Sequence, residues 1–168
     1  MGALDPILAE LEAEGQTTKR VLDRVPEDKL GWKPHEKSMT LGELALHVAE
    51  MPGQIAQMVA APGFDIDPAN FPGPGQPKTC REILDAFKNS NATAKETLSK
   101  MDDSAASAMW KVTLLGKEVM SMPRIAFIRS IMLNHMYHHR GQLSVYLRLL
   151  NVPVPSIYGP SADENPFG

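Results

Sequence analysis

Apolar residues recur at helical spacing in four stretches of the chain, separated by segments rich in proline and glycine. The first stretch spans residues 4–25 and ends before Pro26, because proline breaks a helix. The second begins after Thr40, which has the spacing of a capping box with Glu43. Pro52 falls inside this second stretch and is expected to kink or locally unwind it. Its inward stripe is Leu44, His47, Met51 and Met58.

The third and fourth stretches complete the helical pattern. The third spans residues 79–101 and opens with Thr79 and Glu82, the spacing of a second capping box. The fourth spans residues 123–150 and starts at a proline, which suits a first helical position. Between them, residues 109–120 hold two short β-prone runs around a glycine, which fit either a small hairpin or an irregular crossover.

Four long helices without a repeat or a strand–helix alternation predict an all-α four-helix bundle. Residues 62–77 are half proline and glycine, so we expect a long connection without regular structure there. We expect residues 1–168 to form one domain, with residues 151–168 as an extended C-terminal tail. The long connections are 26–40, 62–78 and the crossover 102–121.

Composition excludes several classes of protein. The 168 residues have a formal net charge of −3 and no block of lysine or arginine, which argues against a nucleic-acid partner. No signal-peptide pattern opens the chain and no apolar run approaches about 18 residues, so we expect a cytoplasmic protein without membrane contact. The single cysteine, Cys80, cannot form an internal disulfide.

The fourth stretch carries the most informative residues. His135 and His139 stand four positions apart, which places their side chains one turn apart on one helix face. Apolar residues share that face, so both histidines are predicted to point inward. Two imidazoles at this spacing can bind one ion at about 2.0–2.1 Å, but two hydrogen-bonded core histidines explain the pair as well. The complete stripe is Ile125, Ile128, Met132, His135, His139, Gln142 and Tyr146.

His47 favours the metal interpretation, because it lies on the inward stripe of a second helix. Three of the five histidines therefore fall on inward faces. In the first stretch Gly15 and Thr18 interrupt the apolar stripe, at the depth expected for His47 if the two helices are antiparallel. A cavity over an ion and simple close packing of helices both account for this gap.

Three neutral imidazoles would leave positions open on an ion, as in catalytic rather than structural sites. Nickel and zinc suit imidazole best and iron is a third option, whereas magnesium and calcium prefer oxygen. Such an ion lowers the pKa of bound water or thiol, or polarises a carbonyl. The chain has no His-Glu-x-x-His pattern, so a zincin mechanism is not indicated.

Neighbouring polar residues have weaker claims to a role. Gln142 and Tyr146 are the candidate catalytic residues: Gln142 would contact substrate or support a ligand, and Tyr146 would line the same cavity or simply pack. His138 is expected to face a neighbouring helix or solvent. We expect Arg140 on an exposed or interfacial side, in an ion pair or subunit contact. Cys80 opens a helix, where the dipole lowers a thiol pKa, but no base is close in sequence.

These residues resemble the DinB-like family, DNA-damage-inducible proteins of bacteria related to a superfamily of thiol-dependent transferases. The resemblance covers most of the chain. It is carried by Trp32-Lys-Pro34, by Ser38-Met-Thr-Leu-Gly-Glu-Leu-Ala-Leu-His47, by His135-Met-Tyr-His-His139-Arg-Gly-Gln-Leu143 and by the tail at 153–164.

The resemblance implies a four-helix bundle with up-down-down-up connectivity, a long crossover and a homodimer. It also implies a divalent metal, often nickel or zinc, on residues matching His47, His135 and His139. Relatives of known activity use low-molecular-weight thiols such as mycothiol or bacillithiol for isomerisation or S-transfer. The family name does not imply a DNA-binding role, and the acidic charge argues against one.

Three functions are consistent with these observations. In the first, a three-His ion binds a thiol cofactor as thiolate and presents it to a small electrophilic substrate. In the second, metal-bound water attacks the substrate in a hydrolysis. In the third, the protein is a non-catalytic, stress-associated metal-binding protein.

Overall fold

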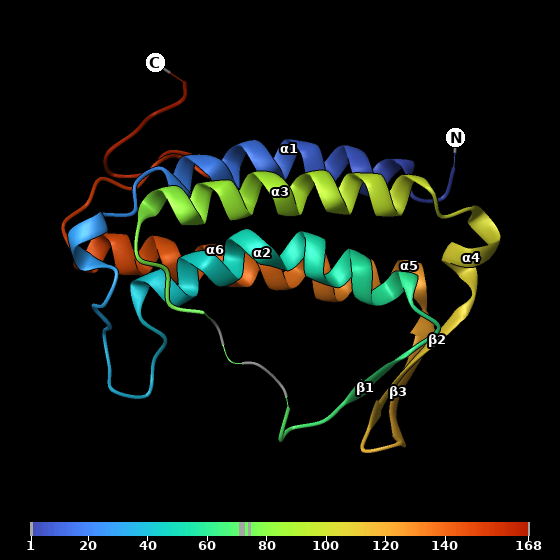
Figure 1. Ribbon diagram of the computed structural model, residues 1–168. Coiled ribbons are helices and arrows are strands. Elements are labelled where there is room, and N and C mark those ends of the chain that lie inside the picture. Colours follow the sequence, from blue (N-terminus) through green and yellow to red (C-terminus); the bar gives the residue numbers. More distant parts are fainter. Residues whose placement is uncertain (1, 71–72, 74, 168) are drawn as a thin grey trace.

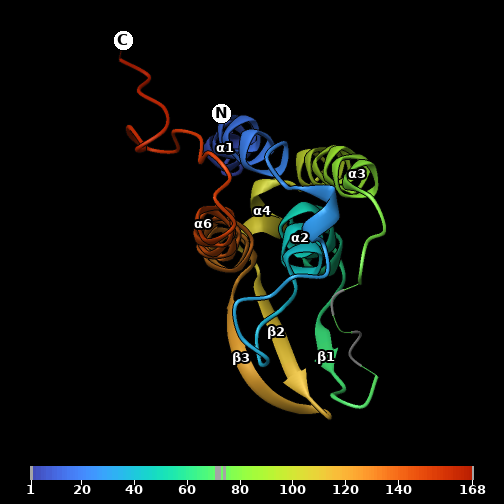
Figure 2. The same cartoon turned by 90° about the vertical axis from the view of Figure 1, so that its left-hand side faces the viewer.

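The computed structural model describes residues 2–70, 73 and 75–167. Four long helices pack along one another, with α1 and α3 in one layer and α2 and α6 in the other (Figures 1 and 2). The long helices are α1 (Asp5–Leu22), α2 (Leu41–Ala60), α3 (Cys80–Ser99) and α6 (Asn134–Leu149). The shorter helical elements are a 3₁₀ turn (Glu27–Lys29), α4 (Asp103–Ser107), α5 (Arg124–Phe127) and a π-helical turn (Ile128–Leu133).

The prediction of an all-α, up-down-down-up four-helix bundle is wrong, because the chain also forms a three-stranded mixed sheet. The central strand β2 (Met109–Leu114) pairs antiparallel with β3 (Lys117–Pro123) and parallel with β1 (Phe64–Ile66). The segment 109–120 is therefore a hairpin. The segment 62–77 is not wholly irregular, since it supplies β1; its residues 71, 72 and 74 lie outside the described residues.

The sheet closes one end of the helical core. Trp110 and Val112 on β2 are buried, and the Trp110 indole Nε1 donates a hydrogen bond to the Ala61 carbonyl at 2.9 Å. Arg124 donates from Nε to the Val59 carbonyl at 2.9 Å, so two side chains cover the carbonyl end of α2. In Figures 1 and 2 the sheet lies on the side of α2 and α6 that faces away from α1 and α3.

Both predicted helix starts carry a cap, although only one is complete. Thr40 accepts from the Glu43 amide at 3.1 Å, and the Glu43 carboxylate accepts from the Thr40 amide at 2.7 Å, so the capping box of α2 is confirmed. At α3, Thr79 accepts from the Glu82 amide at 3.2 Å. The Glu82 carboxylate accepts instead from the amide of Lys78, so the reciprocal half of that box is missing.

Pro52 lies inside α2, where a side chain of α3 satisfies the neighbouring backbone. The Ser90 hydroxyl donates to the Glu50 carbonyl and accepts from the Gly53 amide, both at 2.8 Å. A Cβ on Gly53 would come within 2.9 Å of the Ser90 carbonyl oxygen, so only glycine allows the two helices to approach so closely. This contact fixes α2, and with it His47, against α3.

The fourth predicted helix is divided by the π-helical turn Ile128–Leu133. A π turn contains an extra residue, which rotates the following helix relative to the preceding one. Ile128 and Met132 of the predicted stripe are buried, but beyond Met132 most of the buried residues are offset from the stripe by one position. The offset residues are Leu133, Met136, Arg140, Leu143 and Leu147, whereas His139 is buried on the predicted stripe.

The tail after α6 is held against the helices by ion pairs. Arg148 pairs with Asp163 and Arg20 pairs with Glu164, which ties the tail to both α6 and α1. Ser156 is buried within this segment. Across the described residues, no helix combines the length and the apolar character needed to cross a membrane.

Candidate metal centre

His47, His135 and His139 form the group of ligand atoms that the structure brings together from α2 and α6. One ring nitrogen of each lies within 4.8 Å of the others. The His47 ring centroid is 5.5 Å from that of His135 and 4.7 Å from that of His139, and Nε2 of His135 is 2.6 Å from Nε2 of His139. Two nitrogens on a tetrahedral zinc ion stand about 3.3 Å apart, so a small ring movement accommodates an ion.

The three rings lie at the edge of the core rather than in its centre. His139 is 9% exposed, and His47 and His135 are partly exposed. The π-helical turn explains this position, because it turns the buried face toward the residues that follow the two histidines. The predicted inward orientation is therefore only partly right, and solvent can reach the cluster.

The electrostatics of the cluster favour neutral imidazoles. The pKa of His139 is lowered to about 4, chiefly by burial and also by the neighbouring histidines, while a hydrogen bond to Gln142 opposes the shift. The pKa values of His47 and His135 are also lowered, first by burial and then by another histidine. Neutral imidazole is the form that binds a metal. The donor set therefore fits a divalent ion such as zinc or nickel.

Of the two candidate catalytic residues, only Gln142 contacts the cluster. Its Oε1 lies 2.7 Å from Nδ1 of His139. Tyr146 instead packs its ring edge against Trp32, with centroids 5.6 Å apart, and donates its hydroxyl to the Met39 carbonyl at 3.3 Å. Tyr146 thus connects α6 to the 31–40 loop.

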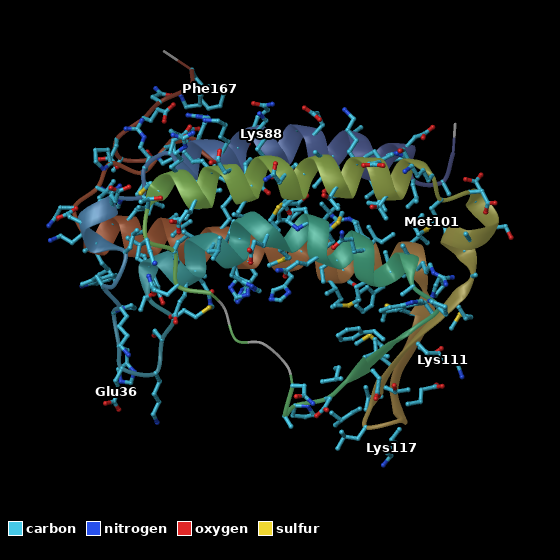
Figure 3. All side chains as sticks on the ribbon, in the orientation of Figure 1. Glu36, Lys88, Met101, Lys111, Lys117 and Phe167 are labelled. Carbon is cyan, nitrogen blue, oxygen red and sulfur yellow. The ribbon has the colours of Figure 1, made fainter. Side chains whose placement is uncertain are left out.

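The contact between Tyr146 and the loop also places the cluster relative to the rest of the molecule. Tyr146 and the two α6 histidines share one helix face, and that face meets the 31–40 loop. Figure 3 labels Glu36 in this loop and Lys117 at the hairpin, and both project from the same side of α2 and α6. The face of α6 that carries the two histidines therefore lies toward the 31–40 loop.

The gap at Gly15 and Thr18 is not a cavity over the ion. Thr18 is fully buried and accepts a hydrogen bond from Nη1 of Arg140 at 3.1 Å, so the arginine side chain occupies this space. A Cβ on Gly15 would face Asn91 of α3. Of the two positions expected for Arg140, exposed or interfacial, the structure shows the second: Arg140 is 1% exposed at the interface of α1 and α6, and its ion pair is with Glu14 at 2.7 Å.

Sequence reasoning missed the partners of Arg140, which are Glu14 and, from the tail, Tyr158. The Tyr158 hydroxyl accepts from Arg140 and donates to Glu14 at 3.0 Å. The small residue Thr18 in an otherwise apolar stripe was the available signal, because it leaves room for a long side chain from the facing helix.

His138 and Cys80 have no part in the cluster. His138 is exposed, as expected. The pKa of the Cys80 thiol is raised by burial and by Glu27, so the expected lowering at the helix start does not occur. Its Sγ donates to the Val25 carbonyl at 3.2 Å. Cys80 is a structural residue here.

Comparison with known proteins identifies the family. Residues 1–165 match the DinB family. The chain belongs to this family. It is 25% identical to the uncharacterized protein YrdA of Bacillus subtilis (strain 168) over 162 residues, which cover 96% of this chain and 91% of YrdA.

Solved structures of DinB-like proteins share the fold of this DinB-family chain. A DinB-like protein from Bacillus cereus superimposes with a TM-score of 0.68 at 24% identity, covering 90% of this chain and 95% of that one. The DinB-like protein YjoA from Bacillus subtilis gives a TM-score of 0.65 at 17% identity, covering 88% and 93%. Over most of its length this chain therefore shares the fold of these proteins.

Proposed function

We propose that this DinB-family protein is a divalent-metal-dependent enzyme that joins a low-molecular-weight thiol to a small electrophile. The observation that supports the proposal is the convergence of His47, His135 and His139 at a solvent-reachable edge of the core. Imidazole ligands favour zinc or nickel, with iron as a third option. A divalent ion bound there would supply the charge that lowers the pKa of a thiol or water molecule beside it.

The roles of the chain's own residues follow from their positions. His47, from α2, and His135 and His139, from α6, would hold the ion through neutral ring nitrogens. The opposite side of α6 is closed by Arg140 and its partners, so reactants approach from the side of the 31–40 loop and the hairpin. In the transfer, the thiol sulfur forms a bond to the electrophilic carbon. The leaving group departs with the electron pair of its bond, and the thiol proton passes to solvent.

Metal content tests the ligand assignment. We expect about one divalent ion per chain in the wild-type protein by elemental mass spectrometry, and loss of most of it in the His139→Ala variant. His138→Ala is the matched control, because His138 is the adjacent, exposed histidine outside the cluster, and it should retain the ion. Equal metal content in His139→Ala and wild type would contradict the assignment.

Thiol dependence tests the chemistry. The metal-loaded protein is assayed with 1-chloro-2,4-dinitrobenzene and with an epoxide, each with and without bacillithiol or mycothiol. Product formation that requires both metal and thiol supports S-transfer. Turnover of the epoxide without thiol points to hydrolysis instead. Metal binding without turnover of either substrate favours the non-catalytic alternative.

A further inference from the structure

We propose that Gln142 is a positioning residue that holds His139 in the tautomer protonated on Nδ1. The proposal rests on the proposed function, because it assigns Gln142 to the support of a metal ligand. Gln142 is exposed, whereas the ring that it contacts is 9% exposed. The amide oxygen of an exposed glutamine could bond to water, but here it bonds to a nearly buried ring. The contact therefore indicates that Gln142 orients this ring.

The geometry fixes the position of one proton. Oε1 of Gln142 lies 2.7 Å from Nδ1 of His139, and an amide oxygen only accepts hydrogen bonds. Nδ1 must therefore carry the proton. In a neutral imidazole the second nitrogen is then unprotonated, so Nε2 carries a lone pair.

That lone pair points into the cluster. Nε2 of His139 is 2.6 Å from Nε2 of His135, which places it among the three ligand atoms. In the opposite tautomer Nε2 would carry a proton and could not bind an ion. The Gln142 contact therefore selects the metal-binding form of His139 before any ion arrives.

His139 differs in this respect from the other two histidines. Within residues 2–70, 73 and 75–167, no group other than the His139 ring forms a hydrogen bond with a ring nitrogen of His47 or His135. His139 is thus the ligand whose orientation the protein sets directly. Its support is a neutral amide, so the positive charge of a bound ion is not offset by a neighbouring carboxylate, and an anionic substrate atom is favoured at the open position.

The first test measures the tautomer by ¹⁵N NMR of histidine in the metal-free, full-length protein. We expect the His139 signals of wild type to show Nδ1 protonated and Nε2 unprotonated. Gln142→Met has a similar shape but no acceptor, and should give a mixture of tautomers. Gln142→Glu keeps an acceptor and should retain the wild-type pattern. Val145→Ala, another exposed position of α6, is the control.

The second test measures zinc affinity by competition with a chelator. We expect Gln142→Met to bind about 10- to 100-fold more weakly than wild type, and Gln142→Glu to bind at least as tightly as wild type. The urea midpoint of the metal-free variants should not change, which separates positioning from a structural role. Protonation of His139 on Nε2 in wild type, or unchanged tautomer and affinity in Gln142→Met, would overturn the proposal.

The two proposals fail in different ways. If no variant, including wild type, binds zinc, the proposed function is wrong, but the tautomer measurement still decides whether Gln142 orients His139. If zinc binds normally in Gln142→Met, the role of Gln142 is wrong and the metal site stands.

Discussion

His139 and Arg140 are adjacent in sequence, yet they face different sides of α6 and differ in how their polar groups are satisfied. Arg140 is 1% exposed and its charge is matched by Glu14 at 2.7 Å. Its guanidinium also lies 5.2 Å and 5.1 Å from the ring centroids of Tyr137 and Tyr158. His139 contacts two other histidines and an amide.

The difference distinguishes a polar group that stabilises the fold from polar groups that are available to bind a ligand. A buried arginine with a carboxylate, two hydroxyls and two rings around it has its hydrogen bonds and charge satisfied inside the chain. The group of ligand atoms found among the described residues holds three imidazoles and no carboxylate. It therefore gains most from a cation supplied from outside. Variants on the two sides of α6 should accordingly affect different properties.

The largest effect is expected on the Arg140 side. Arg140→Met removes the charge and leaves Glu14 and Thr18 without their partner between α1 and α6, so the free energy of unfolding should fall by about 3 kcal/mol. Urea denaturation of the metal-free protein measures it. The folded variant should still bind about one metal ion per chain. A decrease in the free energy of unfolding below about 1 kcal/mol, or a loss of metal from the folded variant, would contradict the proposal that the two sides of α6 act independently.

A comparable effect of opposite sign is expected on the histidine side. A ligand that binds only the folded state stabilises it by about 2.7 kcal/mol when its free concentration is 100 times Kd. Addition of zinc or nickel should therefore raise the Tm of the metal-free wild-type protein. The same addition should hardly change the Tm of the His47→Ala variant. Thermal unfolding with and without the ion measures both. An equal rise in Tm for the two proteins would show that the ion binds elsewhere.

The metal-free protein should also lose stability as the pH falls from about 6.5 toward 4. The pKa of His139 is lowered to about 4 when folded and is near 6.5 when unfolded. Between these values the unfolded chain binds a proton that the folded chain does not, so the free energy of unfolding decreases with falling pH. Above pH 7 both states are neutral and this contribution vanishes.

The comparison variant for the pH series is His139→Gln, which has no titrating group at this position. Urea denaturation at pH 7.5, 6.0 and 5.0 should show a steeper decline for wild type than for the variant. Parallel declines in the two proteins would mean that His139 does not take part in this pH dependence.

The smallest effect is expected where the tail meets the Arg140 network. Tyr158→Phe removes a hydroxyl that accepts from Arg140 and donates to Glu14, but leaves the ring in place. A net hydrogen bond contributes about 1 kcal/mol, so the free energy of unfolding should fall by about that amount. Metal affinity should not change, and a marked change would mean that the two sides of α6 are coupled.

The helices and the ligand candidates could be predicted from sequence because both depend on local spacing. The i, i+4 spacing of His135 and His139 places them on one face of any α-helix. His47 lies on α2, which packs against α6. The caps of Thr40 and Thr79 are likewise local. These features need only the period of an α-helix.

What could not be predicted depends on distant parts of the chain. The strand Phe64–Ile66 has three residues, too few to show a period, and it exists because β2 pairs with it from more than forty positions away. The buried position of Arg140 followed from the π-helical turn, since a stripe projected on a regular α-helix puts the wrong residues at the centre of the interface. The all-α prediction failed for the first reason, and the sequence left Arg140 open between an exposed and an interfacial position for the second.

The π-helical turn has a consequence for how this helix tolerates insertion and deletion. Removing one residue between positions 128 and 133 would restore a regular α-helix and rotate everything after it by about 100°. In such a variant the imidazoles of α6 would point away from His47, and the Arg140 guanidinium would point away from Glu14. The length of this short segment, rather than the identity of any residue in it, keeps both sides of the helix in register with their neighbours.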